Sequence, residues 1–156
     1  MTGDVIRSRA LAFVGLFAAT LVLGIVLLIA FEPDIQDIDA DELVARSDDA
    51  RAFLAADYLF IVLYAILSPI AIWRFGTTLG DGSPPLWIRL APLCLAAAGV
   101  FDAIENTLLL SATDSASSGA VDAAHAVAIP KVALFVAGAA LAIAALVRAI
   151  QVLRAT

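Results

Sequence analysis

The fold prediction rests first on the run IRLAPLCLAAAGVFDAIENTLLLS, residues 88–111. Its length suits an α-helix that crosses a bilayer, because each residue adds 1.5 Å toward roughly 30 Å of hydrocarbon. Asp102, Glu105 and Asn106 nevertheless lie within five positions of one another in its second half. Such a helix is stable in a membrane only if these polar side chains face other helices, so the run predicts a transmembrane bundle.

The composition of the whole chain supports a membrane protein. Of 156 residues, 63% are hydrophobic, and the mean hydropathy is +1.01, whereas soluble domains are roughly 45–50% apolar. Three further apolar runs are long enough to span a bilayer. We therefore expect an all-α, integral membrane four-helix bundle that forms a single domain over residues 1–156. Its predicted spans are about 10–31, 53–73, 88–111 and 121–147, and an acidic outer loop occupies 32–52.

The arginines predict the orientation of the bundle. Short connections rich in Lys and Arg face the cytoplasm, and six arginines lie at the termini or between the second and third spans: Arg7, Arg9, Arg74, Arg89, Arg148 and Arg154. The other two connections contain only Arg46 and Arg51. We expect both termini to face the cytoplasm. We also expect a multi-pass protein of the cell (plasma) membrane.

Within the acidic loop, Asp39 and Glu42 have the spacing of a capping box. This pattern predicts a short surface helix that continues through Leu43 and Val44. Pro33 is expected to end the first span, because proline cannot continue a helix.

Helical spacing predicts that the polar residues of the spans converge. Asp102 and Glu105 are three positions apart, and Asp102 and Asn106 are four apart, so they share one helix face. In the second span Asp57 and Tyr64 lie on a similar stripe, and Lys131 lies in the fourth span. With the predicted orientation, all of them lie between the outer surface and mid-membrane.

The energetic cost of these charges favours a binding site. A charge at mid-span costs about 2.5–3.5 kcal/mol, so four of them facing lipid would cost on the order of 10 kcal/mol. One lysine cannot neutralise three carboxylates, which predicts a shared proton, a bound cation or a cationic ligand. The residues predicted to bind a ligand or proton are Asp102, Glu105, Asn106, Lys131, Asp57 and Tyr64. The alternative is that they serve only as polar contacts between helices.

The sequence predicts no cofactor and no dedicated metal site. His125, in the fourth span, is a weak candidate for a metal ligand, which would need carboxylates as partners. The chain has no second histidine, which excludes a bis-histidine haem.

The function predicted first is transport or binding: an outward-facing pocket of carboxylates and lysine that binds or moves a proton, a cation or a small polar ligand. One alternative is an intramembrane lipid-modifying enzyme that uses its carboxylates as acid and base; no constellation with a nucleophile supports it, and no catalytic residue is assigned. Another is an accessory subunit of a larger membrane complex. The expected partner is the lipid bilayer, with a homo-oligomer or larger complex left open and no nucleic acid.

Overall fold

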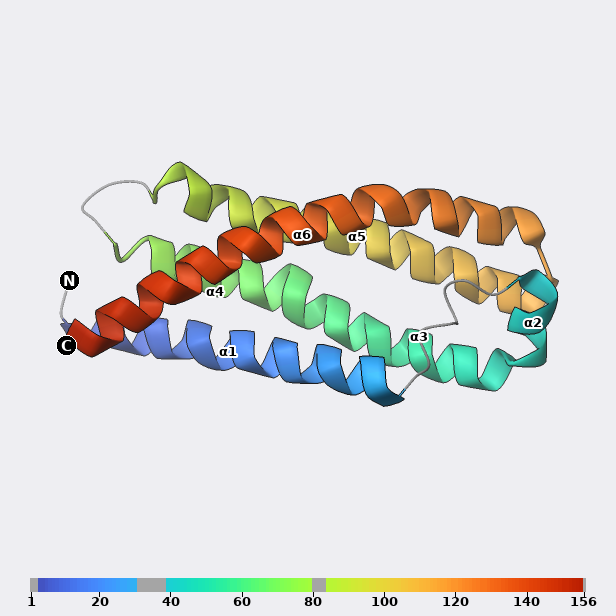
Figure 1. The fold of residues 1–156 in the computed structure, drawn as a ribbon, viewed down its shortest axis with the longest axis horizontal. Coiled ribbons are helices and arrows are strands. Elements are labelled where there is room, and N and C mark those ends of the chain that lie inside the picture. Colours follow the sequence, from blue (N-terminus) through green and yellow to red (C-terminus); the bar gives the residue numbers. More distant parts are fainter. Residues whose placement is uncertain (1–2, 31–38, 80–83, 156) are drawn as a thin grey trace.

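A computed structural model describes residues 3–30, 39–79 and 84–155 of the chain (Figure 1). These residues form helices, and no strand occurs among them. In chain order the elements are α1 (Gly3–Ala30), α2 (Ala40–Ala45), α3 (Ser47–Ile61), the π-helix η2 (Val62–Leu67), α4 (Ser68–Gly76), α5 (Leu86–Ser115) and α6 (Ser118–Ala155).

Four helical segments are long and apolar enough to cross a membrane, which confirms the predicted fold class. They are α1, the continuous helix from α3 through η2 to α4, α5, and α6. Each begins before, or ends after, the apolar run that predicts it, because polar and charged turns extend the helices. The two termini lie at the same end of the bundle, and α2 lies at the opposite end (Figure 1).

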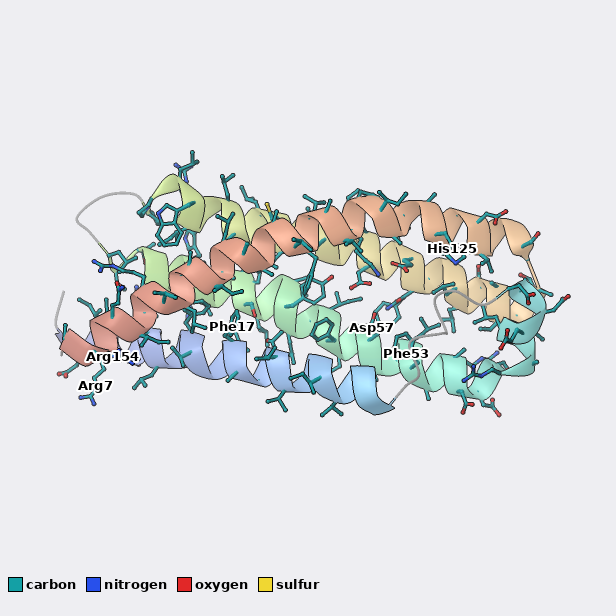
Figure 2. The ribbon with its side chains drawn as sticks, in the orientation of Figure 1. Arg7, Phe17, Phe53, Asp57, His125 and Arg154 are labelled. Atoms are coloured by element: carbon teal, nitrogen blue, oxygen red, sulfur yellow. The ribbon has the colours of Figure 1, made fainter. Side chains whose placement is uncertain are left out.

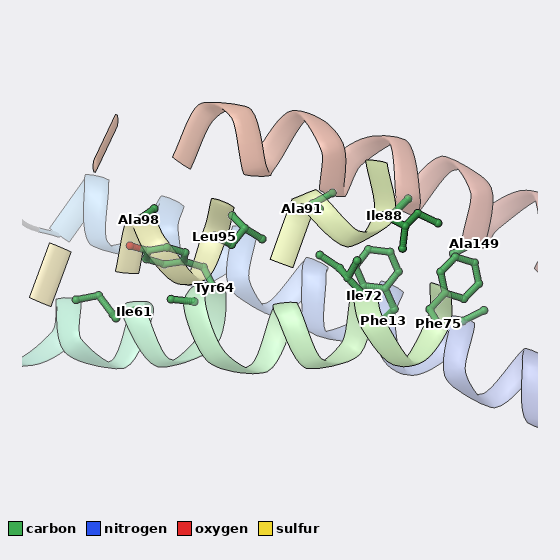
Figure 3. Close-up of a cluster of buried hydrophobic side chains, with 14 residues drawn as sticks. Phe13, Ile61, Tyr64, Ile72, Phe75, Ile88, Ala91, Leu95, Ala98 and Ala149 are labelled. Carbon is green, nitrogen blue, oxygen red and sulfur yellow. The ribbon is translucent and has the colours of Figure 1, made fainter. Parts of the chain in front are cut away.

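A core of aliphatic, aromatic and small side chains holds the helices together, and it extends from Phe13 and Phe75 to Tyr64 (Figure 3). Phe13 of α1 stacks on Phe75 of α4, with ring centroids 5.9 Å apart. At Gly138 of α6, an added Cβ would stand 2.9 Å from the side chain of Leu95 in α5. The small residue therefore lets these two helices approach closely, as small residues do in membrane bundles.

The π-turn η2 interrupts the second span. The amide of Ser68 donates to the carbonyl of Leu63, five residues earlier, which is π-helical spacing. The next residue, Pro69, has no N–H with which to bond the carbonyl of Ala65 in α-helical register. The wider turn accommodates this missing donor, and it carries Tyr64, which is buried.

The short helix α2 caps the end of the bundle away from the termini. The side chain of Asp39 accepts a hydrogen bond from the amide of Glu42 at 2.9 Å, which confirms the predicted helix start. Leu43 is fully buried in a cluster with Leu54 and Leu109, so α2 packs into the bundle. The predicted stop at Pro33 and the first part of the acidic loop lie outside the described residues.

Candidate functional site

Three spans place six polar side chains together inside the bundle. Asp57 belongs to α3, Tyr64 to η2, and Lys131 to α6, while Asp102, Glu105 and Asn106 belong to α5. Asp57 lies between the levels of Phe17 and His125 along the long axis (Figure 2). The carboxylates are almost completely buried: Asp57 is 8% exposed, Asp102 6% and Glu105 2%. We call these six residues the polar cluster.

Lys131 pairs with two of the three carboxylates. Its Nζ lies 3.2 Å from Oδ1 of Asp102 and 2.5 Å from Oε2 of Glu105. The first contact is also a hydrogen bond. The second is an ion pair. The hydroxyl of Tyr64 donates to Oδ2 of Asp102 at 2.7 Å, so both oxygens of this carboxylate are engaged.

Asp57 lacks a cationic partner of this kind. Its Oδ2 accepts a hydrogen bond from Nδ2 of Asn106 at 2.7 Å, the one hydrogen bond that it makes among the described residues. The carbonyl oxygen Oδ1 of Asn106 is buried and has no hydrogen-bond partner in the same part of the chain. A buried acceptor without a partner is costly.

A polar pocket of about 190 Å³ opens on this cluster. Asp57, Asp102 and Lys131 contribute its polar lining together with Tyr64. The rest of the lining is Phe60, Val132 and Phe135. The volume exceeds the ~30 Å³ that one water occupies in the liquid, so a small molecule fits there.

An apolar cavity of about 310 Å³ adjoins the polar pocket. The two share Phe60, Tyr64 and Phe135 as lining residues. The rings of Phe60 and Tyr64 have centroids 5.1 Å apart, and those of Tyr64 and Phe135 are also 5.1 Å apart in an edge-to-face arrangement. Tyr64 stands at one end of the apolar core (Figure 3), and its hydroxyl reaches the polar cluster.

The structure brings together all six residues that the sequence selects as a site. Phe60 and Phe135 were missed as lining residues. Their spacing could have indicated them, because Phe60 follows Asp57 by three positions and Phe135 follows Lys131 by four.

His125 is exposed and precedes Lys131 by six positions in α6. Among the residues that the structure describes, no group of three or more His, Cys, Asp or Glu side chains could hold a metal ion. His125 is therefore not a member of such a group there.

Comparison with known proteins returns no relative. No protein-family model matches the chain, and neither a curated protein nor a solved structure is significantly similar to it. The fold and the site geometry together define a small polytopic membrane protein with a buried, charged interior.

Proposed function

We propose that this membrane protein binds a cation in the polar pocket, as a transporter or a transporter subunit would. The observation that carries the proposal is the position of Asp57. It is nine-tenths buried, lines the pocket, and accepts a hydrogen bond only from a neutral amide among the described residues. Lys131 meanwhile contacts Asp102 and Glu105.

The charge balance supports a cation over an anion. Three carboxylates and one ammonium group leave two formal negative charges in the cluster. A bound cation would offset the cost of burying them, since buried charges are stable only when they are paired. An anion in the same pocket would meet Asp57 and Asp102 at close range.

The pocket lining supports binding over nucleophilic catalysis. Among the described residues that line it, none is Ser, Thr or Cys. Ser68 instead lines the apolar cavity, where its hydroxyl lies 3.5 Å from that of Thr20. The one hydroxyl among the described lining residues, that of Tyr64, donates to the buried Asp102, and the carboxylates and Lys131 can hold charge.

Thermal unfolding of the purified protein in detergent tests the proposal. We expect sodium, potassium or tetramethylammonium chloride, added at constant ionic strength, to raise the unfolding temperature saturably. A ligand at 100 times its dissociation constant stabilises the folded state by about 2.7 kcal/mol. The shift should be lost in Asp57→Asn.

The matched control is Asp49→Asn, which makes the same change at an exposed position of the same helix, α3. This variant should retain the whole shift. If none of the three cations stabilises the wild type more than Asp57→Asn, the proposal is wrong, and the polar cluster serves as a contact between helices.

A further inference from the structure

We propose that the ligand is an amphiphilic organic cation, an alkylammonium in chemical class, whose head occupies the polar pocket and whose tail occupies the adjoining apolar cavity. This inference rests on the proposed function and narrows its ligand. The polar pocket and the apolar cavity share three aromatic lining residues, Phe60, Tyr64 and Phe135. This arrangement indicates one ligand with a charged head and an apolar tail.

The polar pocket suits the head of an organic cation better than a bare metal ion. Phe60, Tyr64 and Phe135 supply three aromatic rings beside the carboxylates of Asp57 and Asp102. Aromatic rings attract ammonium groups, and such rings form the cages that recognise quaternary ammonium ligands. A metal ion requires several oxygen ligands that converge within about 2–2.6 Å, and the described residues contain no group of three or more acidic, His or Cys side chains that could hold one.

The apolar cavity suits a hydrocarbon tail. Its lining includes two hydroxyl side chains, Thr20 and Ser68, which lie against each other. The remaining lining is hydrocarbon, glycine or aromatic, apart from the Tyr64 hydroxyl that already donates to Asp102. A polar ligand would lose its hydration there without gaining new partners.

The apolar cavity also lies where a ligand could enter from the bilayer. Its walls come from all four spans, and the lining residues Leu21, Ile25 and Ile143 are about half exposed on the surface of the bundle. Helix α6 meets α1 near the termini and lies beside α5 further along (Figure 1). A tail could therefore move from lipid into the space between α1 and α6 while the head reaches Asp57.

The charge of the head group is expected to determine which amphiphiles bind. The tail region would accept any alkyl chain, whereas two formal negative charges beside the head region repel an anionic head group. An alkylsulfonate with the same tail is therefore the matched negative control.

Photo-crosslinking in lipid nanodiscs tests the inference with the full-length protein. The probe is an alkyltrimethylammonium that carries a diazirine in its tail, and mass spectrometry locates the labelled residues. We expect labelling within residues 17–25 and 139–143. Labelling should fall roughly tenfold in Asp57→Asn, a factor that corresponds to 1.4 kcal/mol, and remain unchanged in Asp49→Asn.

A second variant separates this inference from the proposed function. Ala139→Leu fills part of the apolar cavity with a larger side chain and changes no residue of the polar cluster. It should lose the labelling and keep the stabilisation by tetramethylammonium, which also shows that it is folded.

Equal labelling by the sulfonate probe, or labelling that is indifferent to Asp57→Asn, would overturn the inference. If tetramethylammonium still stabilises the wild type in that case, the cation site stands and only the tail assignment fails. If tetramethylammonium has no effect either, both proposals fail.

Discussion

Tyr64 contacts both the apolar core and the polar cluster inside the bundle. Its ring packs against Phe60 and Phe135, and its hydroxyl donates to Asp102 at 2.7 Å. Asp102 also contacts Lys131 through its other oxygen. Loss of the hydroxyl would leave a buried carboxylate oxygen without its donor, and a hydrogen bond to a charged group contributes about 1.5–3 kcal/mol.

Tyr64→Phe should therefore lower the free energy of unfolding by about 1.5–3 kcal/mol. Tyr58→Phe is the matched control, since the Tyr58 hydroxyl lies 2.9 Å from Oγ1 of Thr107 at a more exposed contact between α3 and α5. A hydrogen bond between membrane helices contributes about 0.6 kcal/mol on average. Denaturation in detergent measures the free energy of unfolding of both variants. If both lose the same amount, the hydrogen bond from Tyr64 to Asp102 contributes no more than the exposed one.

At the scale of elements, η2 and α5 contact each other next to the polar cluster. Gly99 and Ala65 meet there, and a Cβ added at Gly99 would overlap the Cβ of Ala65. Gly99 lies one turn before Asp102, so any separation of the helices at this point would also move the site.

Gly99→Ala should consequently destabilise the protein by about 1–3 kcal/mol, the range typical of overpacking. Ala65→Gly in the same chain should restore part of the loss, because it removes the overlapping methyl group. Gly15→Ala is the control, since a Cβ at Gly15 meets no described atom within 4 Å. Thermal unfolding compares the four proteins. If Gly99→Ala and Gly15→Ala unfold at the same temperature, the close contact between Gly99 and Ala65 does not limit the side chain at position 99.

At the scale of the whole molecule, charge is distributed unevenly between the two ends. Arg7 and Arg154 lie at the end where both termini are found (Figure 2). At the other end, Arg51 pairs with Asp114 and connects the start of α3 to the end of α5. The positive-inside rule then predicts that the end with the termini faces the cytoplasm.

Accessibility of single cysteines tests this orientation. In a Cys94→Ala background, Ser118→Cys and Ala155→Cys place a thiol at exposed positions on the opposite ends of α6. A membrane-impermeant maleimide should label Ser118→Cys in intact cells and Ala155→Cys only after permeabilisation. The reverse pattern would invert the topology and place the polar cluster nearer the cytoplasmic surface.

The sequence by itself determined the four spans and the membership of the polar cluster. Apolar length specifies a transmembrane helix, because the backbone must satisfy its own hydrogen bonds in lipid. Spacings of three and four placed Asp102, Glu105 and Asn106 on one face, and the cost of charge in lipid turned that face inward. The capping pattern at Asp39 likewise predicted α2 from local chemistry.

Only the tertiary structure decided which charges pair and which face the pocket. Periodicity assigns a residue to a helix face, but the approach of three separate helices sets the contacts of Lys131 with Asp102 and Glu105 and leaves Asp57 to Asn106. The same holds for the burial of Leu43 and for the three aromatic side chains that line both cavities. Each depends on side chains far apart in the chain, and a local pattern carries no information about their distance.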